Sequence, residues 1–366
     1  MFNFKNYLNW PVAAAFLGAA SLLASCDSAI YEDLPICEQS SRHAVKFQWT
    51  RNMLGSDAFS ANVHSVAVYV FDENDKYVTT FSESGDILAM QGYTLPIVGL
   101  EPGEYTFVAW CGLDNSMEGD TRSESFTVDN CVAGKTSRQD LLCTMKRDIY
   151  SDGTHHSSEE LYDLYHGTAY GVTIYDDNDL GDDHIYTINL TKDTNNVAII
   201  LQNLSGEDVD ISKFFFQIEE NNGTMKPDNS LDENDEVINY HEYDTFTGTA
   251  GVDIDTKGTR AIENVSTGMA LIKTSRLMSN KHSMLTIRNT DTDEVVARIP
   301  MIDYALIGKV GSPKGKNMTD QEYLDSQDDY KLTFFLDKNG NWINASININ
   351  NWTIYIDDVN MGGNDY

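Results

Sequence analysis

Short β-rich runs recur along most of this 366-residue chain, and polar turns separate them. Residues 63–71 and 77–81 flank the polar turn 72–76, and residues 330–336 and 342–349 flank an Asn339-Gly340 turn. Asn-Gly between two such runs is the strongest short-range signal for a β-hairpin. Many short strands without alternating helices predict an all-β fold of antiparallel sandwiches.

The length of the chain and its hydrophobic fraction of 41% are sufficient for two domains, each with its own core. A polar segment over residues 191–195 separates β-rich runs at 185–190 and 197–201. We therefore expect a border near residue 192, with an N-terminal sandwich over residues 40–192 and a C-terminal sandwich over residues 193–366.

One helix is expected to interrupt the β pattern. Thr319 and Glu322 have the spacing of a capping box, in which each side chain caps the other residue's backbone N–H. This spacing predicts a short helix near residues 319–329. The glycine- and lysine-rich segment 308–316 lacks the spacing of a phosphate-binding loop, and Asn317 stands where Ser or Thr is needed. We expect a surface loop there.

The N-terminus has the features of a bacterial lipoprotein signal. Lys5 precedes an apolar run over residues 12–23, which is too short to span a bilayer. The run ends at Leu23-Ala24-Ser25-Cys26, which resembles a lipobox. We expect a signal peptide over residues 1–25, lipid such as palmitate on Cys26, and a lipidated tether over residues 26–39. A plain signal peptide with an incidental Cys26 is the alternative.

Four cysteines follow the expected cleavage site: Cys37, Cys111, Cys131 and Cys143. A compartment outside the cytoplasm permits disulfides. Four cysteines allow three pairings, and the sequence does not choose among them. Free buried thiols are the alternative.

The formal net charge of −32 argues against several partners. A chain this acidic repels phosphate backbones, so we expect no nucleic-acid partner. It also disfavours a peripheral grip on anionic lipid, which leaves lipid on Cys26 as the membrane attachment.

Sequence signals for catalysis are missing. The chain contains neither G-x-S-x-G nor H-E-x-x-H, so we expect no enzyme, no catalytic residues and no cofactor. The acidic segments 176–183 and 228–236 do not have the spacing of a calcium loop, which favours solvated loops and no metal site, although calcium binding there stays open.

Several motifs follow one another along the chain, and their order is specific although no single one is. They comprise Cys26 and residues 30–37, 68–73, 103–110, 164–167, 190–197, 322–325 and 351–352. In this order they resemble the FimB-like fimbrial anchor lipoproteins of the Bacteroidales, which stand at the base of type V fimbriae. Cys111 departs from the pattern, because a small residue is expected after Trp110.

This resemblance implies two tandem transthyretin-like β-sandwiches and no enzymatic activity. It implies an outer-membrane, surface-exposed lipoprotein that anchors a fimbrial shaft, limits its length and takes part in cell adhesion. The shaft subunit is the implied protein partner. β-strand addition is a suitable way to engage it, because an open sheet edge binds a neighbour's strand through main-chain hydrogen bonds. The alternative is a surface lipoprotein that binds glycan or another host ligand without a fimbria.

Overall fold

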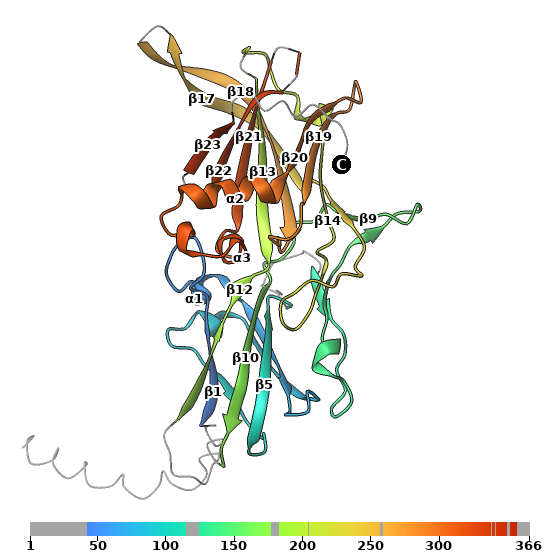
Figure 1. Ribbon diagram of the computed structural model, residues 1–366, viewed down its shortest axis with the longest axis vertical. Helices are drawn as coiled ribbons and strands as arrows, with labels where there is room; N and C mark the ends of the chain where they lie inside the picture. Colours follow the sequence, from blue (N-terminus) through green and yellow to red (C-terminus); the bar gives the residue numbers. More distant parts are fainter. Residues whose placement is uncertain are drawn as a thin grey trace, which may run out of the picture. The chain divides into compact units, whose positions relative to one another are not determined.

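The computed structural model describes residues 42–114, 124–176, 183–203, 205–256, 259–337, 339–340, 342–349 and 352–356, without the side chains of residues 250–265, 343–349 and 352–356. The expected signal peptide, Cys26, the tether and Cys37 lie outside the described residues. The chain forms β-sheets with few helices, which confirms the predicted all-β fold (Figure 1).

Two sheets form what we call the N-terminal sandwich. Their strand orders are β12-β10-β5-β2-β3 and β11-β1-β4. Between them lies a core cluster that includes Phe47, Val68 and Phe107. The strands are β1 (His43–Gln48), β2 (Ser65–Phe71), β3 (Tyr77–Ser84), β4 (Leu95–Ile97), β5 (Gly103–Cys111), β10 (Tyr165–Ile174), β11 (His184–Asn189) and β12 (Thr191–Lys192).

Two six-stranded sheets form the C-terminal sandwich, with orders β17-β18-β13-β21-β22-β23 and β20-β19-β14-β16-β9-β8. Ile199, Phe216 and Phe334 are buried in its core cluster. Its strands are β8 (Asp148–Ile149), β9 (His155–Ser157), β13 (Thr194–Asn203), β14 (Phe214–Glu220), β16 (Ile238–Tyr240), β17 (Asp244–Thr256), β18 (Thr259–Ser275), β19 (Met284–Asn289), β20 (Val295–Pro300), β21 (Asp329–Leu336), β22 (Trp342–Ile349) and β23 (Trp352–Ile356).

A small sheet and short 3-10 turns complete the described secondary structure. The small sheet has the order β15-β7-β6. Its strands are β6 (Phe126–Val128), β7 (Cys143–Met145) and β15 (Thr224–Met225), and the turns are η1 (Asp86–Ala89), η2 (Arg138–Asp140), η3 (Ile211–Lys213) and η4 (Gly315–Asn317).

Both predicted hairpins are present. β2 and β3 pair in antiparallel register around a turn in which Asp75 has a φ of 57°. β21 and β22 also pair antiparallel, and Gly340 in their turn has a φ of 79°, which a residue without Cβ adopts at little cost.

Three strand pairs depart from the predicted antiparallel arrangement. β1 with β11, β13 with β21, and β9 with β16 are parallel. Each pair joins strands that are distant in sequence, so no hairpin signal marks it. Sequence reasoning finds hairpins because they are local, and it therefore misses these long crossovers.

The helices confirm one prediction and correct another. α3 (Asp320–Leu324) starts at the predicted capping box, but it is shorter than residues 319–329 because β21 already begins at Asp329. Residues 308–311, expected in a surface loop, form the last turn of α2 (Met301–Gly311). α2 buries Met301, Ile302 and Ala305 in the core, and this burial stabilises it. α1 (Phe59–Asn62) is one turn long. Among the described helices, none is long and apolar enough to cross a membrane.

Among the described strands, the final passage of the chain from the N-terminal to the C-terminal sandwich takes one residue, Asp193. β12 pairs with β10 in the N-terminal sandwich, and β13 pairs with β18 and β21 in the C-terminal one. Asp193 is the only residue between β12 and β13. An earlier excursion also exists, since β8 and β9 join the C-terminal sandwich before the chain returns to β10.

Candidate functional site

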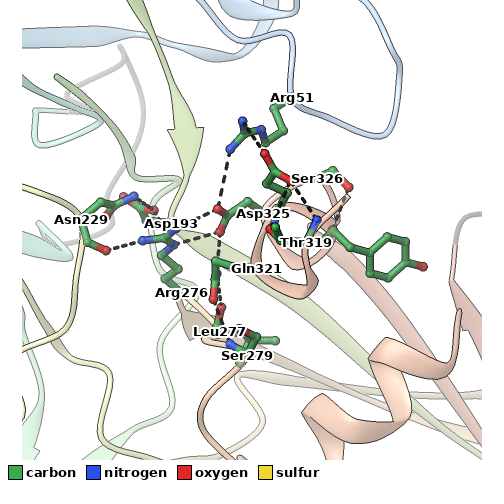
Figure 2. Close-up of polar contacts among 12 residues, drawn as sticks. Arg51, Asp193, Asn229, Arg276, Leu277, Ser279, Thr319, Gln321, Asp325 and Ser326 are labelled. Carbon is green, nitrogen blue, oxygen red and sulfur yellow. Dashed lines mark hydrogen bonds and ion pairs between the residues drawn. The ribbon is translucent and has the colours of Figure 1, made fainter. Parts of the chain in front are cut away.

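A cluster of buried charges surrounds the crossing at Asp193 (Figure 2). Arg276, directly after β18, binds Asp325 in a bidentate way, with Nε to Oδ1 at 3.0 Å and Nη2 to Oδ2 at 2.8 Å. Its Nε also lies 3.6 Å from Oδ1 of Asp193. Asn229 donates to the same Asp193 oxygen at 3.0 Å, and its carbonyl accepts from Arg276. One guanidinium therefore links two other chain segments, at Asn229 and Asp325, to the crossing.

Burial makes the Asp193 carboxyl group a weaker acid than usual. Its side chain is 0% exposed, and no described group hydrogen-bonds its Oδ2. Burial raises the pKa of Asp193 to about 7, although Arg276 and Asn229 favour the charged form. Burial lowers the pKa of Arg276, but Asp193 and Asp325 outweigh this effect and raise it. The network therefore contains a carboxyl that exchanges its proton near neutral pH.

A second cluster lies one residue earlier in the chain. Lys192 Nζ lies 2.9 Å from Asp328 and 3.0 Å from Asp163, and Lys273 Nζ lies 2.7 Å from Asp163. Burial raises the pKa of Asp163, but the two lysines more than offset it, so the pKa is lowered. Lys192 also lies 5.9 Å from the centroid of the Trp49 ring. Since Trp49 follows β1 and Asp328 precedes β21, this cluster too joins both sandwiches.

α3 positions the end of the network. The Asp325 carboxylate accepts from Gln321 at 2.8 Å, and the Gln321 amide donates to Leu277 O at 3.1 Å and accepts from Ser279 N at 2.9 Å. Arg51 in the N-terminal sandwich reaches Asp325 at 4.0 Å (Figure 2). Asp325, at the C-cap of α3, therefore meets cations from both sandwiches.

The arrangement is suited to holding strands together. Three buried cations pair with four carboxylates. The cations are Lys192, Lys273 and Arg276, and the carboxylates are Asp163, Asp193, Asp325 and Asp328. Buried pairs of this kind become costly when one partner is removed, by roughly 3–5 kcal/mol, because the other is left uncompensated. The paired charges lie where strands of the two sandwiches meet.

Three of the cysteines predicted as disulfide candidates lie in the described part of the chain. Cys111 and Cys143 are buried, Cys131 is half-buried, and all three carry free thiols. Burial raises the pKa of each thiol. Cys26 and Cys37 lie outside the described residues, so a partner for Cys37 stays open.

The acidic segments differ in how much of them is described. Residues 177–182 of the first lie outside the described part of the chain. In the second, Asp228 accepts from the Ser230 backbone at 3.0 Å and hydroxyl at 2.7 Å, as in an ordinary turn. Within the described ranges, no group of three or more His, Cys, Asp and Glu side chains is placed to hold a metal ion.

Two of the sequence motifs contain residues of the network, although the network as a whole has no local sequence signal. The motifs 164–167 and 190–197 meet at the junction, where Tyr165 pairs with Lys192. In the first motif, His166 is buried, its Nε2 lies 3.0 Å from Pro227 O, and its ring lies 4.5 Å from that of Trp110. Gly167 has no room for a Cβ, which would lie 2.6 Å from Asn189 O. Arg276 carries no local sequence signal, because its partners are 47 to 83 residues away.

Residues 35–358 match the model of the family described as fimbrillin-A associated anchor proteins Mfa1 and Mfa2. No curated protein sequence matches the chain.

Solved structures with the same fold come from Bacteroidales. A candidate polysaccharide-binding protein of Bacteroides thetaiotaomicron is 27% identical with a TM-score of 0.66, covering 86% of this chain and 98% of that one. A candidate adhesin of the same species is 29% identical with a TM-score of 0.70, covering 86% and 97%. The fimbrial anchor protein Mfa2 of Porphyromonas gingivalis is 18% identical with a TM-score of 0.57, covering 86% and 98%; at this identity the likeness shows the fold alone.

Proposed function

The chain belongs to the family of fimbrillin-A associated anchor proteins, and from this premise we propose that it is a lipid-anchored outer-membrane protein that holds a fimbrial shaft on the cell surface and limits the length of that shaft. The family is one of fimbrial structural proteins rather than of enzymes. The match over residues 35–358 is the observation that carries the proposal, since it spans both sandwiches and confirms the resemblance found in the motifs.

Membrane attachment through Cys26 is the first part of the proposal. The lipobox over residues 23–26 supports it. Each buried methylene contributes roughly 0.8 kcal/mol, so two or three acyl chains hold a protein almost permanently. A shaft under external drag needs an attachment of this kind.

The buried charge network supports a role in carrying mechanical load. A pull that crosses from one sandwich to the other passes through the chain at Asp193 and through the contacts around it. Lys192 and Arg276 bind carboxylates on both sides of the crossing at Asp193. This crossing near residue 192 is also where we propose the domain border, with β8 and β9 as an excursion of the first half into the second sandwich.

Shaft subunits are the proposed protein partner, bound by β-strand addition. β3, β17, β20 and β23 each stand at the end of a described sheet, and such edges offer unpaired backbone groups. An added strand gains affinity from main-chain hydrogen bonds and specificity from alternate side chains.

The test of anchoring compares two cysteines of the same segment. Cys26→Ser should move the protein from the membrane fraction to the medium, together with the shaft protein. Cys37→Ser is the matched control and should leave both on the cell. In a deletion strain the shaft protein should still be made, but fimbriae should be shed or reach abnormal length. A Cys26→Ser protein that stays on membranes after a high-salt wash contradicts the lipid attachment.

Glycan binding is the second candidate function. One structural relative is described as a candidate polysaccharide-binding protein. Here the Tyr170 ring is 61% exposed, with the Arg138 guanidinium carbon 5.6 Å from its centroid. If the deletion leaves the shaft protein on the cells and fimbrial length unchanged, but abolishes polysaccharide binding, glycan binding replaces anchoring.

A further inference from the structure

Two buried oxygen atoms at the crossing have no hydrogen-bond donor among the described residues. They are Oδ2 of Asp193 and Oδ1 of Asn229. The same two side chains are already joined through their other atoms, since Asn229 Nδ2 donates to Asp193 Oδ1 at 3.0 Å (Figure 2). Asp193 is 0% exposed and Asn229 is 7% exposed. A buried acceptor without a donor is costly, and two of them on one bonded pair call for a common explanation.

A single proton on Asp193 Oδ2 would satisfy both atoms. A protonated carboxyl group has one O–H donor and keeps its other oxygen as an acceptor. Asp193 would then donate through Oδ2 to Asn229 Oδ1 and accept at Oδ1 from Asn229 Nδ2, which closes a ring of two hydrogen bonds. An ionised Asp193 has only acceptors, so it leaves the amide oxygen of Asn229 without a donor.

The charges of the junction independently leave room for one proton, because three cations pair with four carboxylates. Three of the carboxylates have a cation nitrogen at 2.7, 2.8 and 2.9 Å, in the pairs Asp163–Lys273, Asp325–Arg276 and Asp328–Lys192. Asp193 is the fourth, and its ion pair with Arg276 is longer, at 3.6 Å. A proton on Asp193 therefore balances the cluster at the carboxylate whose charge is least compensated.

The turn of residues 226–230 holds Asn229 against the crossing and also touches the N-terminal sandwich. Asn229 has a φ of 65°, a conformation that asparagine adopts more readily than most residues. Its backbone N donates to Lys226 O at 2.8 Å, and its carbonyl accepts from Arg276. Pro227 O of the same turn accepts from Thr168 of β10 at 3.1 Å. The turn therefore links both sandwiches to the crossing.

We propose that Asp193 carries a proton on Oδ2 and donates it to Asn229 Oδ1, so that a neutral acid–amide pair closes the turn of residues 226–230 onto the crossing, and that this closure weakens as the pH rises from 6 to 8. When the proton passes to water, the two acceptor oxygens are left without a donor, and the turn opens more readily. This inference does not depend on the proposed anchoring function, because it concerns only the described residues at the crossing.

Charged groups face the pair from several elements. Arg276, after β18, and Asp325, at the end of α3, lie beside Asp193, and Arg51 reaches Asp325 from the N-terminal sandwich. The second cluster lies one residue earlier in the chain, and its members are Lys192, Lys273, Asp163 and Asp328.

Other titratable groups lie at the turn and in the core beside it. Nε2 of His166 lies 3.0 Å from Pro227 O, and burial lowers the pKa of His166 to about 4. Burial raises the pKa of Asp228, but hydrogen bonds within the turn more than offset this effect, so the pKa is lowered. Burial raises the pKa of the Cys111 and Cys143 thiols. An exposed histidine titrates at about 6.5, so the experiment must separate the effect of His166 from that of Asp193.

The direction of the pH effect follows from linkage. The closed pair keeps its proton up to about pH 7, because burial raises the pKa of Asp193 to about 7, whereas an exposed aspartic acid releases its proton at about 4. Each opening of the turn therefore releases a proton and becomes easier as the pH rises. From pH 6 to 8, Asp193 should raise the opening constant about tenfold.

Hydrogen exchange of the backbone amides of residues 224–232 measures this opening in the whole protein. Asp193→Asn is the first variant, because its amide can accept from Asn229 Nδ2 and donate to Asn229 Oδ1 at every pH. The ratio of the wild-type opening constant to that of Asp193→Asn cancels His166, which both proteins contain. We expect this ratio to rise about tenfold from pH 6 to 8. Asp228→Asn makes the same change on the exposed neighbour in the turn, and its ratio should change less than twofold.

Infrared spectra locate the proton itself, because a protonated carboxyl group has a carbonyl band apart from that of a carboxylate. The difference between wild type and Asp193→Asn should contain this band at pH 6, about tenfold weaker at pH 8. Asn229→Gly tolerates the positive φ and removes the amide. It should shift the band to higher frequency, because the O–H loses its acceptor.

The outcomes separate the two parts of the inference. If the difference band is absent at pH 6, or the ratio of opening constants stays constant within twofold, Asp193 does not hold a proton and the proposal is wrong. If the band is present but does not move in Asn229→Gly, the proton is not shared with Asn229 and the acid–amide pair is wrong. Thermal unfolding at pH 6 checks that each variant is folded.

Discussion

At the scale of single residues, two buried groups near the crossing have pKa values shifted in opposite directions. Burial raises the pKa of Asp193 to about 7, and burial lowers the pKa of His166 to about 4. Folded Asp193 keeps a proton that the unfolded chain releases, so its contribution to stability falls as pH rises from about 4 to 7. In the folded protein His166 stays neutral, whereas in the unfolded chain it takes up a proton below about pH 6.5. Its contribution to stability therefore falls as the pH drops toward 4.

The two contributions oppose each other over nearly the same pH window, and each is on the order of 3 kcal/mol. Removing either group should therefore leave the effect of the other uncompensated in the pH dependence of the free energy of unfolding. Asp193→Asn should make the free energy of unfolding fall more steeply than in the wild type between pH 7 and 5. His166→Gln, whose amide can still donate to Pro227 O, should change the slope in the opposite sense. Urea unfolding at both pH values measures this; parallel slopes in all three proteins would contradict it.

At the scale of elements, α3 shows how a local motif serves a distant contact. Thr319 Oγ1 accepts from Glu322 N at 3.1 Å, and the Glu322 carboxylate accepts from Thr319 N at 2.9 Å. The helix is only five residues long, so its capping box is a large part of what holds it. Asp325, at its C-cap, is the carboxylate that Arg276 binds.

Thr319→Ala removes the hydroxyl that caps Glu322 N and should lower the free energy of unfolding by about 1 kcal/mol. Thr319→Ser keeps a hydroxyl and is the matched control, with an expected loss well below that of alanine. Hydrogen exchange should show faster opening of residues 320–325 in the alanine variant, with the core strands unchanged. Equal exchange in the two variants would mean that packing of Tyr323 and Leu324, rather than the cap, holds the helix.

At the scale of the whole molecule, the junction charges join segments of the two sandwiches. Arg276 binds Asp325, approaches Asp193 and donates to the Asn229 carbonyl. Asp325 also forms an ion pair with Arg51 of the N-terminal sandwich. A single substitution at Arg276 therefore tests the coupling.

Arg276→Met keeps the length of the side chain and removes its charge, which leaves two buried carboxylates without their main partner. We expect the free energy of unfolding to fall by roughly 3–5 kcal/mol and proteases to cut near residue 193. Lys213→Met is the control, because Lys213 pairs with Asp291 on the surface, where both side chains are more than half exposed. An exposed pair of this kind contributes little to stability, because water and salt screen it. Similar losses in both variants would show that the junction does not depend on Arg276.

The sequence by itself determined the local features of this protein. The Asn339-Gly340 turn, the Thr319–Glu322 capping box and the alternating runs rest on interactions within a few residues, and the structure contains all of them. The order of the motifs also indicated the family, which the match over residues 35–358 confirms. Two of these motifs, 164–167 and 190–197, meet at the junction.

Only the tertiary structure decided what depends on distant contacts. α2 forms because its apolar residues meet a core built from both sheets of the C-terminal sandwich, and its own sequence reads like a loop at residues 308–311. The parallel pair of β13 with β21 joins residues more than 130 positions apart. The acidity of Asp193 follows from burial beside Arg276, a partner 83 residues away. Local rules act over a turn of helix or one hairpin, whereas burial and charge pairing depend on which segments the whole fold brings together.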